Sequence, residues 1–243
     1  MGHRTKKPLR LPEPESRPIS PGLRVSSKPD DWLVWQLVDS AFPTGGFAHS
    51  SGLEAAWQHG EVRGRVELVS YLEASLDQLG HAALPFVLAA WDHHERSPEF
   101  DRLYDVFTTN HVANRASRAQ GRAFLTAVER VFKSEIRNLE SQVEFAHFAP
   151  LFGGCLGRLG LAREVVARMF FFNHLRGLLA AAVRLNIVGP MEAQVLQQRL
   201  APKAELVRQA CEHLALDQIA QTSPLLDLWQ GTQDCLYSRL FQS

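Results

Sequence analysis

The chain has 243 residues and a mass of 27.2 kDa, enough to bury one substantial core. Its 26 basic residues balance its 26 acidic ones, so its overall charge does not favour nucleic acid or an anionic membrane as a partner. The three cysteines are widely spaced, which argues against a disulfide framework or a thiolate zinc cage. No apolar run reaches the roughly 20 residues of a membrane span. A cytoplasmic location is the default expectation.

The beginning of the sequence, residues 1–29, is basic and contains six prolines but few large apolar side chains. Burial cannot offset the entropy cost of ordering such a segment. We therefore predict a disordered proline-rich extension over residues 1–29 and one domain over residues 30–243. A transit peptide or a docking arm is the alternative, although Glu13 and Glu15 are atypical of a transit sequence.

Helix signals recur through the rest of the chain. A short apolar stripe follows Asp30 and stops before Pro43, and Ser51 and Glu54 have the spacing of a capping box that opens a helix. The apolar residues of the next segment, residues 66–79, then repeat every three or four positions.

The most apolar stretch, residues 161–188, has hardly any polar face, which predicts a helix at the centre of the core or in a subunit interface. A helical hairpin broken at Pro202 should follow it. Alternating strand patterns are absent from the sequence. We predict an all-α fold, a single-domain bundle of about eight to ten helices.

The loop between the first two predicted helices, residues 39–54, reads DSAFPTGGFAHSSGLE and is rich in turn-forming and hydrogen-bonding residues. One interpretation is a serine hydrolase whose nucleophile, base and orienting carboxylate are drawn from Ser40, Ser50, His49, Asp39 and Glu54.

The alternative interpretation of this loop is structural. In it Gly45 and Gly46 supply backbone freedom, Ser50 or Ser51 caps a helix, and two aromatic residues fill the core, namely Phe42 and Phe47. The sequence has no Gly-Lys dipeptide and no GxGxxG, GxSxG or HExxH motif, so no P-loop or common enzyme signature favours catalysis.

Two further groups of charged residues stand out. Arg115, Arg118 and Arg122 share one face of a predicted helix, where they can receive an acidic partner or a phosphate, or be solvated or paired with glutamates inside the fold. His93 and His94 are candidate metal ligands, but adjacent helical residues point about 100° apart and make a poor chelate.

The end of the chain places Leu236, Tyr237, Leu240 and Phe241 on one stripe of a predicted terminal helix. Such anchors indicate that the tail either folds back on its own core or is a short helix offered to a groove of another protein. Spacing alone leaves both alternatives open.

Two segments, residues 39–54 and the terminal YSRLFQS, resemble the characteristic motifs of the UreF family of urease accessory proteins. Between them, Asn114-Arg115-Ala116-Ser117 and Gln120-Gly121-Arg122 resemble weaker family landmarks in the expected order. The chain departs from the pattern in its long proline-rich extension, and residues 229–235 lack a histidine that many relatives carry.

The resemblance implies an all-helical homodimer that has no enzymatic activity and no cofactor, and that is required for nickel-dependent maturation of urease. It implies that the protein binds UreD, called UreH in some systems, recruits the GTPase UreG, couples its GTP hydrolysis to nickel delivery and thereby activates apo-urease. The serine hydrolase that uses Ser50 and His49, and a direct nickel-binding carrier, remain alternatives.

The resemblance also implies which residues contact partners. Two of the three arginines on one face of the predicted helix, Arg115 and Arg118, are added to that set. The predicted partner-binding residues are Asp39, Ser40, Phe42, Pro43, Gly45, Phe47, His49, Ser50, Gly52, Glu54, Arg115, Arg118, Tyr237, Ser238, Arg239, Leu240, Phe241 and Ser243.

Overall fold

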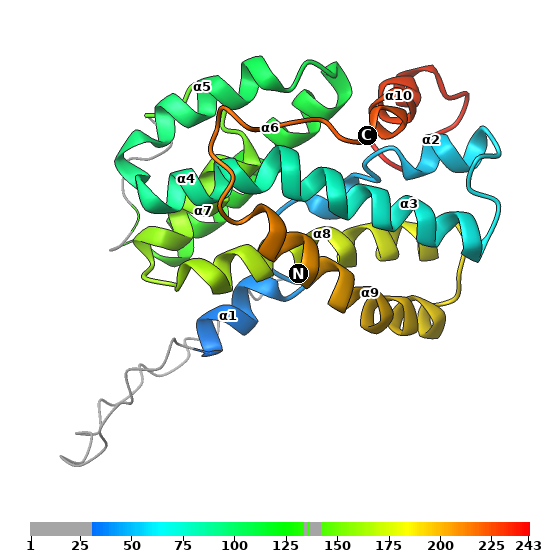
Figure 1. The fold of residues 1–243 in the computed structure, drawn as a ribbon, viewed down its shortest axis with the longest axis horizontal. Coiled ribbons are helices and arrows are strands. Elements are labelled where there is room, and N and C mark those ends of the chain that lie inside the picture. Colours follow the sequence, from blue (N-terminus) through cyan, green and yellow to red (C-terminus); the bar gives the residue numbers. More distant parts are fainter. Residues whose placement is uncertain (1–30, 134–135, 137–141) are drawn as a thin grey trace, which may run out of the picture.

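A computed structural model describes residues 31–133, 136 and 142–243, and this part of the chain is helical and contains no strand (Figure 1). The all-α prediction is therefore confirmed. The extension predicted over residues 1–29 lies outside the described residues. None of the helices that the structure describes is long and apolar enough to span a bilayer.

A π-helical turn at Leu79–Ala83 joins α3 directly to α4. The bounds of the α-helices are α1 Asp31–Val38, α2 Leu53–Gln58, α3 Arg65–Gln78, α4 Leu84–Asp92, α5 Ser97–Phe107, α6 His111–Val131, α7 Phe148–Arg158, α8 Arg163–Arg184, α9 Pro190–Cys211 and α10 Pro224–Thr232.

Helix α8 connects two hydrophobic clusters. Its first turns contribute Val166 and Phe170 to a cluster built mainly on α4, α6 and α7. Its later turns contribute Leu175 and Leu179 to a second cluster, with α3 and α9. The apolar stretch that the sequence marks as central is thus a core helix, with apolar residues on most of its circumference because it packs against neighbours on several sides.

Glycines let two helix pairs approach closely. A Cβ atom placed on Gly153 of α7 would lie 1.9 Å from the carbonyl oxygen of Val87 in α4, and one on Gly121 of α6 would lie 1.9 Å from that of Ala146, just before α7. No side chain fits at such distances. The packing of α7 between α4 and α6 therefore depends on glycine at both positions.

The predicted break at Pro202 is wrong, because α9 continues through this residue without interruption. The proline ring removes the N–H that would bond to the carbonyl of Gln198. Pro202 and Gln198 both lie on the exposed face of the helix, where water can satisfy that carbonyl.

Candidate functional site

The last residues of the chain, residues 237–243 (the tail), fold back onto the loop of residues 39–52 (the loop) that precedes α2. The N–H of Gln242 donates to the carbonyl of Ala48 at 2.8 Å, and the N–H and hydroxyl of Ser50 both donate to the main-chain oxygen of Ser243. His49 Nδ1 lies 2.6 Å from Ser243 Oγ. Figure 1 shows the end of the chain beside α2 and α10. The structure thus brings together the two segments that the sequence singles out.

Glu54 is the main anchor of the tail. Its buried carboxylate accepts hydrogen bonds from the N–H of Leu240 at 2.6 Å, the N–H of Phe241 at 3.1 Å and the side-chain amide of Gln233 at 2.6 Å. One side chain at the start of α2 therefore satisfies two main-chain donors of a segment that has no regular structure of its own.

The capping box predicted from Ser51 and Glu54 is consequently wrong. The N-cap of α2 is Gly52, in the left-handed region at φ +87°, and this residue has no side chain to cap the helix. The hydroxyl of Ser50, not that of Ser51, accepts from the N–H of Glu54, at 3.4 Å. The carboxylate of Glu54 turns to the tail because three donors meet it there.

Arg184, near the end of α8, forms the second attachment between loop and tail. Its guanidinium lies 4.0 Å from the ring centroid of Phe47 and 4.1 Å from that of Phe241, and it donates to the carbonyls of Phe47 at 2.6 Å and Leu240 at 3.4 Å. Arginine suits this position because its planar group stacks on rings while its N–H groups donate at the edge.

Phe42 is buried as predicted, but Phe47 is 73% exposed and does not fill the core. The left-handed turn at Gly45 leads into the short 3₁₀ segment Gly46–Ala48, which holds the Phe47 ring over Arg184 at the surface.

The tail is also attached to α6, through Asp234. This carboxylate accepts two hydrogen bonds from Arg115, at 3.0 and 2.8 Å, and a third from Arg239 at 2.9 Å. Hydrogen bonding from Arg115 is the largest of the effects that lower the pKa of Asp234. Arg115 therefore forms an ion pair within the protein, and its partner is Asp234. Because Asp234 also binds Arg239, this pair connects α6 to the tail. Arg118 instead stacks over the ring of Phe145, at 5.1 Å.

The predicted terminal helix is wrong, because the tail is irregular after the 3₁₀ turn Gln233–Cys235. Its N–H groups bond to Glu54 and Ala48 instead of to the preceding turn. Of the predicted stripe only Phe241 is buried; Tyr237 is fully exposed and Leu240 is 59% exposed. The tail folds back on its own core, and it still presents two large apolar side chains to the outside.

Two more of the predicted site residues belong to this contact. The carbonyl of Ser238 accepts from the side-chain amide of Gln58 in α2, at 2.8 Å. Gly52 lies against α10, where an added Cβ atom would come within 3.0 Å of the main-chain nitrogen of Gln230. Both α2 and α10 therefore support the surface that the loop and the tail form together.

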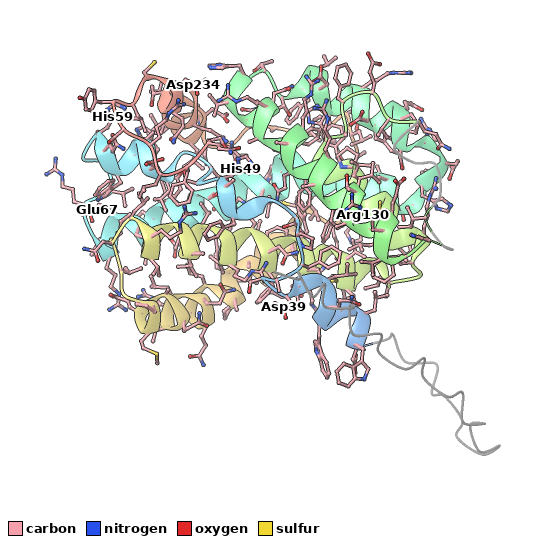
Figure 2. The ribbon with its side chains drawn as sticks, turned by 180° about the vertical axis from the view of Figure 1, so that it is seen from behind. Asp39, His49, His59, Glu67, Arg130 and Asp234 are labelled. Carbon is pink, nitrogen blue, oxygen red and sulfur yellow. The ribbon has the colours of Figure 1, made fainter. Side chains whose placement is uncertain are left out.

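The first residues of the loop lie apart from the tail. Figure 2 shows Asp39 beside α1, away from His49 and Asp234. Asp39 accepts from the N–H of Ala41 at 2.8 Å and shapes the turn after α1, and Ser40 is exposed next to it.

The end of α1 is attached to α8. Arg176 of α8 donates a hydrogen bond to the carbonyl of Val38. Burial lowers the pKa of Arg176, while the negative charge of Asp39 acts in the opposite direction. The α1 end of the loop is therefore held independently of the tail.

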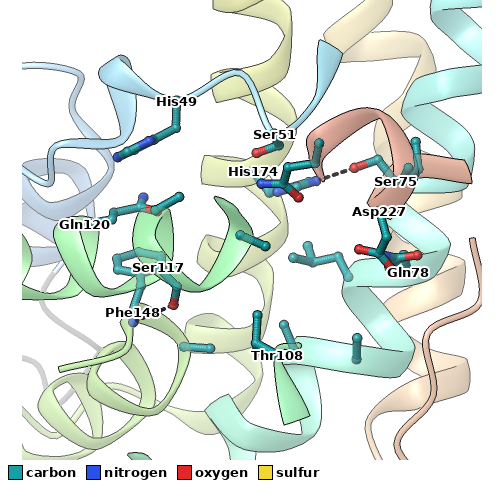
Figure 3. A pocket seen from close by; sticks show the side chains of 18 of the residues that line it. His49, Ser51, Ser75, Gln78, Thr108, Ser117, Gln120, Phe148, His174 and Asp227 are labelled. Carbon is teal, nitrogen blue, oxygen red and sulfur yellow. Dashed lines mark hydrogen bonds between the residues drawn. The ribbon is translucent and has the colours of Figure 1, made fainter. Parts of the chain in front are cut away.

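Two cavities of about 220 and 270 Å³ lie beneath the loop, and the sequence did not predict them. Both are lined by His49, Gln120, Asn173 and His174, and Pro43 also lines the second. Figure 3 shows polar side chains from several helices around the first. The buried Oδ1 atom of Asn173 has no hydrogen-bond partner among the described residues. The sequence shows Asn173 and His174 only as interruptions of an apolar run, so nothing in it indicated a polar interior.

His174 is the titratable group most affected by this environment. Its Nε2 atom lies 2.7 Å from the hydroxyl of Ser75, and burial lowers its pKa to about 4. Burial also lowers the pKa of His49, with a smaller contribution from the charge of Arg115. Both imidazoles are therefore neutral at physiological pH.

The geometry of the loop does not favour the serine hydrolase. Ser50 is fully buried, its hydroxyl donates to Ser243, and it accepts from the N–H of Glu54. The imidazole of His49 contacts the hydroxyl of Ser243 instead of that of Ser50. The hydroxyl of Ser50 thus has a structural role, as the alternative interpretation predicted.

Another serine, histidine and aspartate do come together away from the loop. His147 lies 3.1 Å from Ser117 Oγ and 3.0 Å from Asp105 Oδ1. Ser117 Oγ also accepts from the N–H of Phe148 at the start of α7, and His147 is fully buried. This arrangement joins α5, α6 and α7, and a substrate has no access to its imidazole.

The histidines proposed as metal ligands are exposed around the end of α4, where His93 Nδ1 lies 3.7 Å from Glu95. Within the described part of the chain, no group of three or more histidine, cysteine, aspartate or glutamate side chains is arranged to hold a metal ion.

Comparison with known proteins agrees with the motifs. The UreF family model matches residues 62–201. The chain is 40% identical to Urease accessory protein F of Oryza sativa subsp. indica, over 86% of this chain and 84% of the relative, and 41% identical to that of Arabidopsis thaliana, over 87% and 92%. An uncharacterized UreF-like urease accessory protein of Schizosaccharomyces pombe is 30% identical over 90% of this chain and 100% of the relative. The chain therefore belongs to the UreF family of urease accessory proteins.

Proposed function

We propose that this protein is a non-enzymatic scaffold of urease maturation. It binds UreD (UreH) through the surface formed by the loop and the tail, recruits the GTPase UreG, and couples GTP hydrolysis to nickel delivery into apo-urease. The family supports the role in urease maturation. The proposed contact with UreD rests on one observation: the tail packs against the loop, and the two segments form one continuous surface.

This surface has the composition of a binding site. Phe47, Tyr237 and Leu240 are large apolar residues that are mostly exposed. Aromatic and arginine side chains are enriched at the energetic centres of protein interfaces, and here Arg184 and Arg239 lie beside them. Because buried hydrogen bonds to Glu54 already hold the backbone, a partner would not have to order the tail on binding.

Coupling to GTP hydrolysis requires that the scaffold complex binds one nucleotide state of UreG more tightly than the other. A scaffold with equal affinity for both states shifts no population between them. We expect UreG recruitment in the presence of UreD to differ between GTP and GDP. Equal recruitment with both nucleotides would defeat this part of the proposal.

Pull-down with purified UreD and UreG tests the contact surface. We expect the intact chain to capture UreG only when UreD is present, and a chain lacking residues 237–243 to capture neither protein. A second variant, Tyr237→Ala with Leu240→Ser, alters only exposed side chains and should weaken UreD binding by about tenfold or more.

The matched control is Val66→Ser with Met191→Ser, which changes two comparably exposed apolar residues on α3 and α9. We expect the control to bind UreD as the intact chain does. Unchanged capture by the tail variant would exclude this surface, and equal loss in both variants would argue against a specific contact.

A further inference from the structure

A shallow groove of about 790 Å³ runs along α5 and α6 and shares Thr108 with the first of the two cavities beneath the loop. Arg115, Arg118 and Arg122 line it from α6, and Val106 lines it from α5. The helical spacing of these arginines places them on one face, so the groove carries a row of guanidinium groups.

Two of these guanidinium groups form no ion pair with the part of the chain that the structure describes. Arg115 is paired with Asp234, and Arg118 stacks on Phe145. Arg122 is exposed, and among the described residues no carboxylate lies within ion-pair distance of either Arg118 or Arg122. The groove therefore has positive charge available for a ligand.

One carboxylate also lines the groove, that of Asp105, and it offsets only part of this charge. Asp105 accepts from the side chain of Asn114 at 2.9 Å and lies 3.0 Å from His147. Its negative charge also acts on Arg118, but one carboxylate beside the guanidinium groups of both Arg118 and Arg122 leaves the groove with a net positive charge.

We infer that this groove is a docking site for an acidic segment of a protein partner, in which carboxylates pair with Arg118 and Arg122 and an apolar side chain covers Val106. Charge complementarity and the 75% exposure of Val106 carry the inference. A nucleic acid fits less well, because no phenylalanine, tyrosine or tryptophan lines the groove in the described part of the chain to stack on bases. The inference does not rest on the proposed contact with UreD, and Arg118 and Arg122, which carry it, have no bond to the tail among the described residues.

Fluorescence anisotropy with a labelled peptide, Glu-Glu-Leu-Glu-Glu-Leu, tests the inference on the full chain. We expect binding that weakens as salt is added, and the double variant Arg118→Gln with Arg122→Gln should bind about tenfold more weakly or worse. The control Arg130→Gln with Arg199→Gln removes the same charge from exposed positions outside the groove and should keep the intact affinity.

Because Arg118 stacks on Phe145, the single variant Arg122→Gln provides a change that leaves that contact in place. It should lower the affinity about threefold with an unchanged thermal unfolding curve. Equal binding by the groove and control variants would overturn the inference, as would equal binding of a peptide with glutamine in place of glutamate. An oligouridylate that binds more tightly than the peptide and loses affinity in the same variant would overturn it too, by assigning the groove to nucleic acid.

Discussion

At the scale of single residues, Glu54 decides how the tail is held. Its two carboxylate oxygens accept from Leu240, Phe241 and Gln233 in a buried position. In the sequence, Glu54 belongs to a recognisable motif, and its spacing from Ser51 suggests a local capping role. Its partners in the structure are instead 179 to 187 positions away along the chain. Contacts at such separation leave no local pattern in a sequence.

Replacing Glu54 with glutamine should loosen the tail. The substitution turns one acceptor oxygen into an NH₂ group that faces main-chain or amide donors, which costs about 1–3 kcal/mol. We expect amide hydrogen exchange at Leu240 and Phe241 to accelerate about tenfold or more. Glu61→Gln, at an exposed position, is the control and should leave exchange in the tail unchanged. Unchanged protection in Glu54→Gln would show that the tail is held by other contacts.

His174 should make stability depend on pH. The folded protein keeps this imidazole neutral down to about pH 4, whereas in the unfolded chain it binds a proton near pH 6.5. Between these values the unfolded state binds more protons, so the free energy of unfolding falls as pH decreases from 6.5 toward 4, by up to about 1.4 kcal/mol per pH unit.

Urea denaturation at several pH values in this window measures the effect. In His174→Gln the free energy of unfolding should change less steeply with pH than in the unsubstituted chain, and the difference in slope should correspond to about one bound proton. The exposed-site control His93→Gln should keep the slope of the unsubstituted chain. Parallel slopes for all three proteins would contradict the assigned pKa.

At the scale of elements, periodicity predicted the helices well and their ends less well. The apolar repeats of α3 and the nearly all-apolar α8 are local properties that the sequence displays directly. The predictions for Pro202 and the tail were wrong because tertiary structure decides both. The exposed face of α9 tolerates a proline, and the N–H groups of the tail donate to Glu54 and Ala48.

The crossing of α4 and α7 should tolerate no side chain at Gly153. Gly153→Ala places a methyl group 1.9 Å from the Val87 carbonyl, so the helices must separate, and we expect a loss of about 3 kcal/mol or failure to fold. Gly177→Ala is the control in α8, where no atom outside the helix's own backbone lies within 4 Å of the added Cβ. It should be neutral or raise stability by about 0.5–1 kcal/mol. Equal urea midpoints for the two variants would contradict this account of the crossing.

At the scale of the whole molecule, the two motif segments could be recognised from sequence, but their contact could not. Glu54 and Arg184 join the two segments, and Asp234 attaches the tail to α6; Arg184 and Asp234 lie outside both segments. The cavities beneath the loop were also missed, since their lining combines side chains from distant helices.

The oligomeric state is a prediction at this scale. We expect a homodimer at micromolar concentration, measured by light scattering with and without UreD, because a partner that binds only the dimer would stabilise it. A monomer under both conditions would contradict the expectation.

The distance along the chain between loop and tail has one further consequence. The hydrogen bonds that join them connect residues 186 to 194 positions apart, so this surface exists only in a chain whose two distant ends have come together. A partner that recognises the joined surface would ignore incomplete or misfolded copies of the chain. Recognition and quality control would then be the same event, with no separate proofreading step.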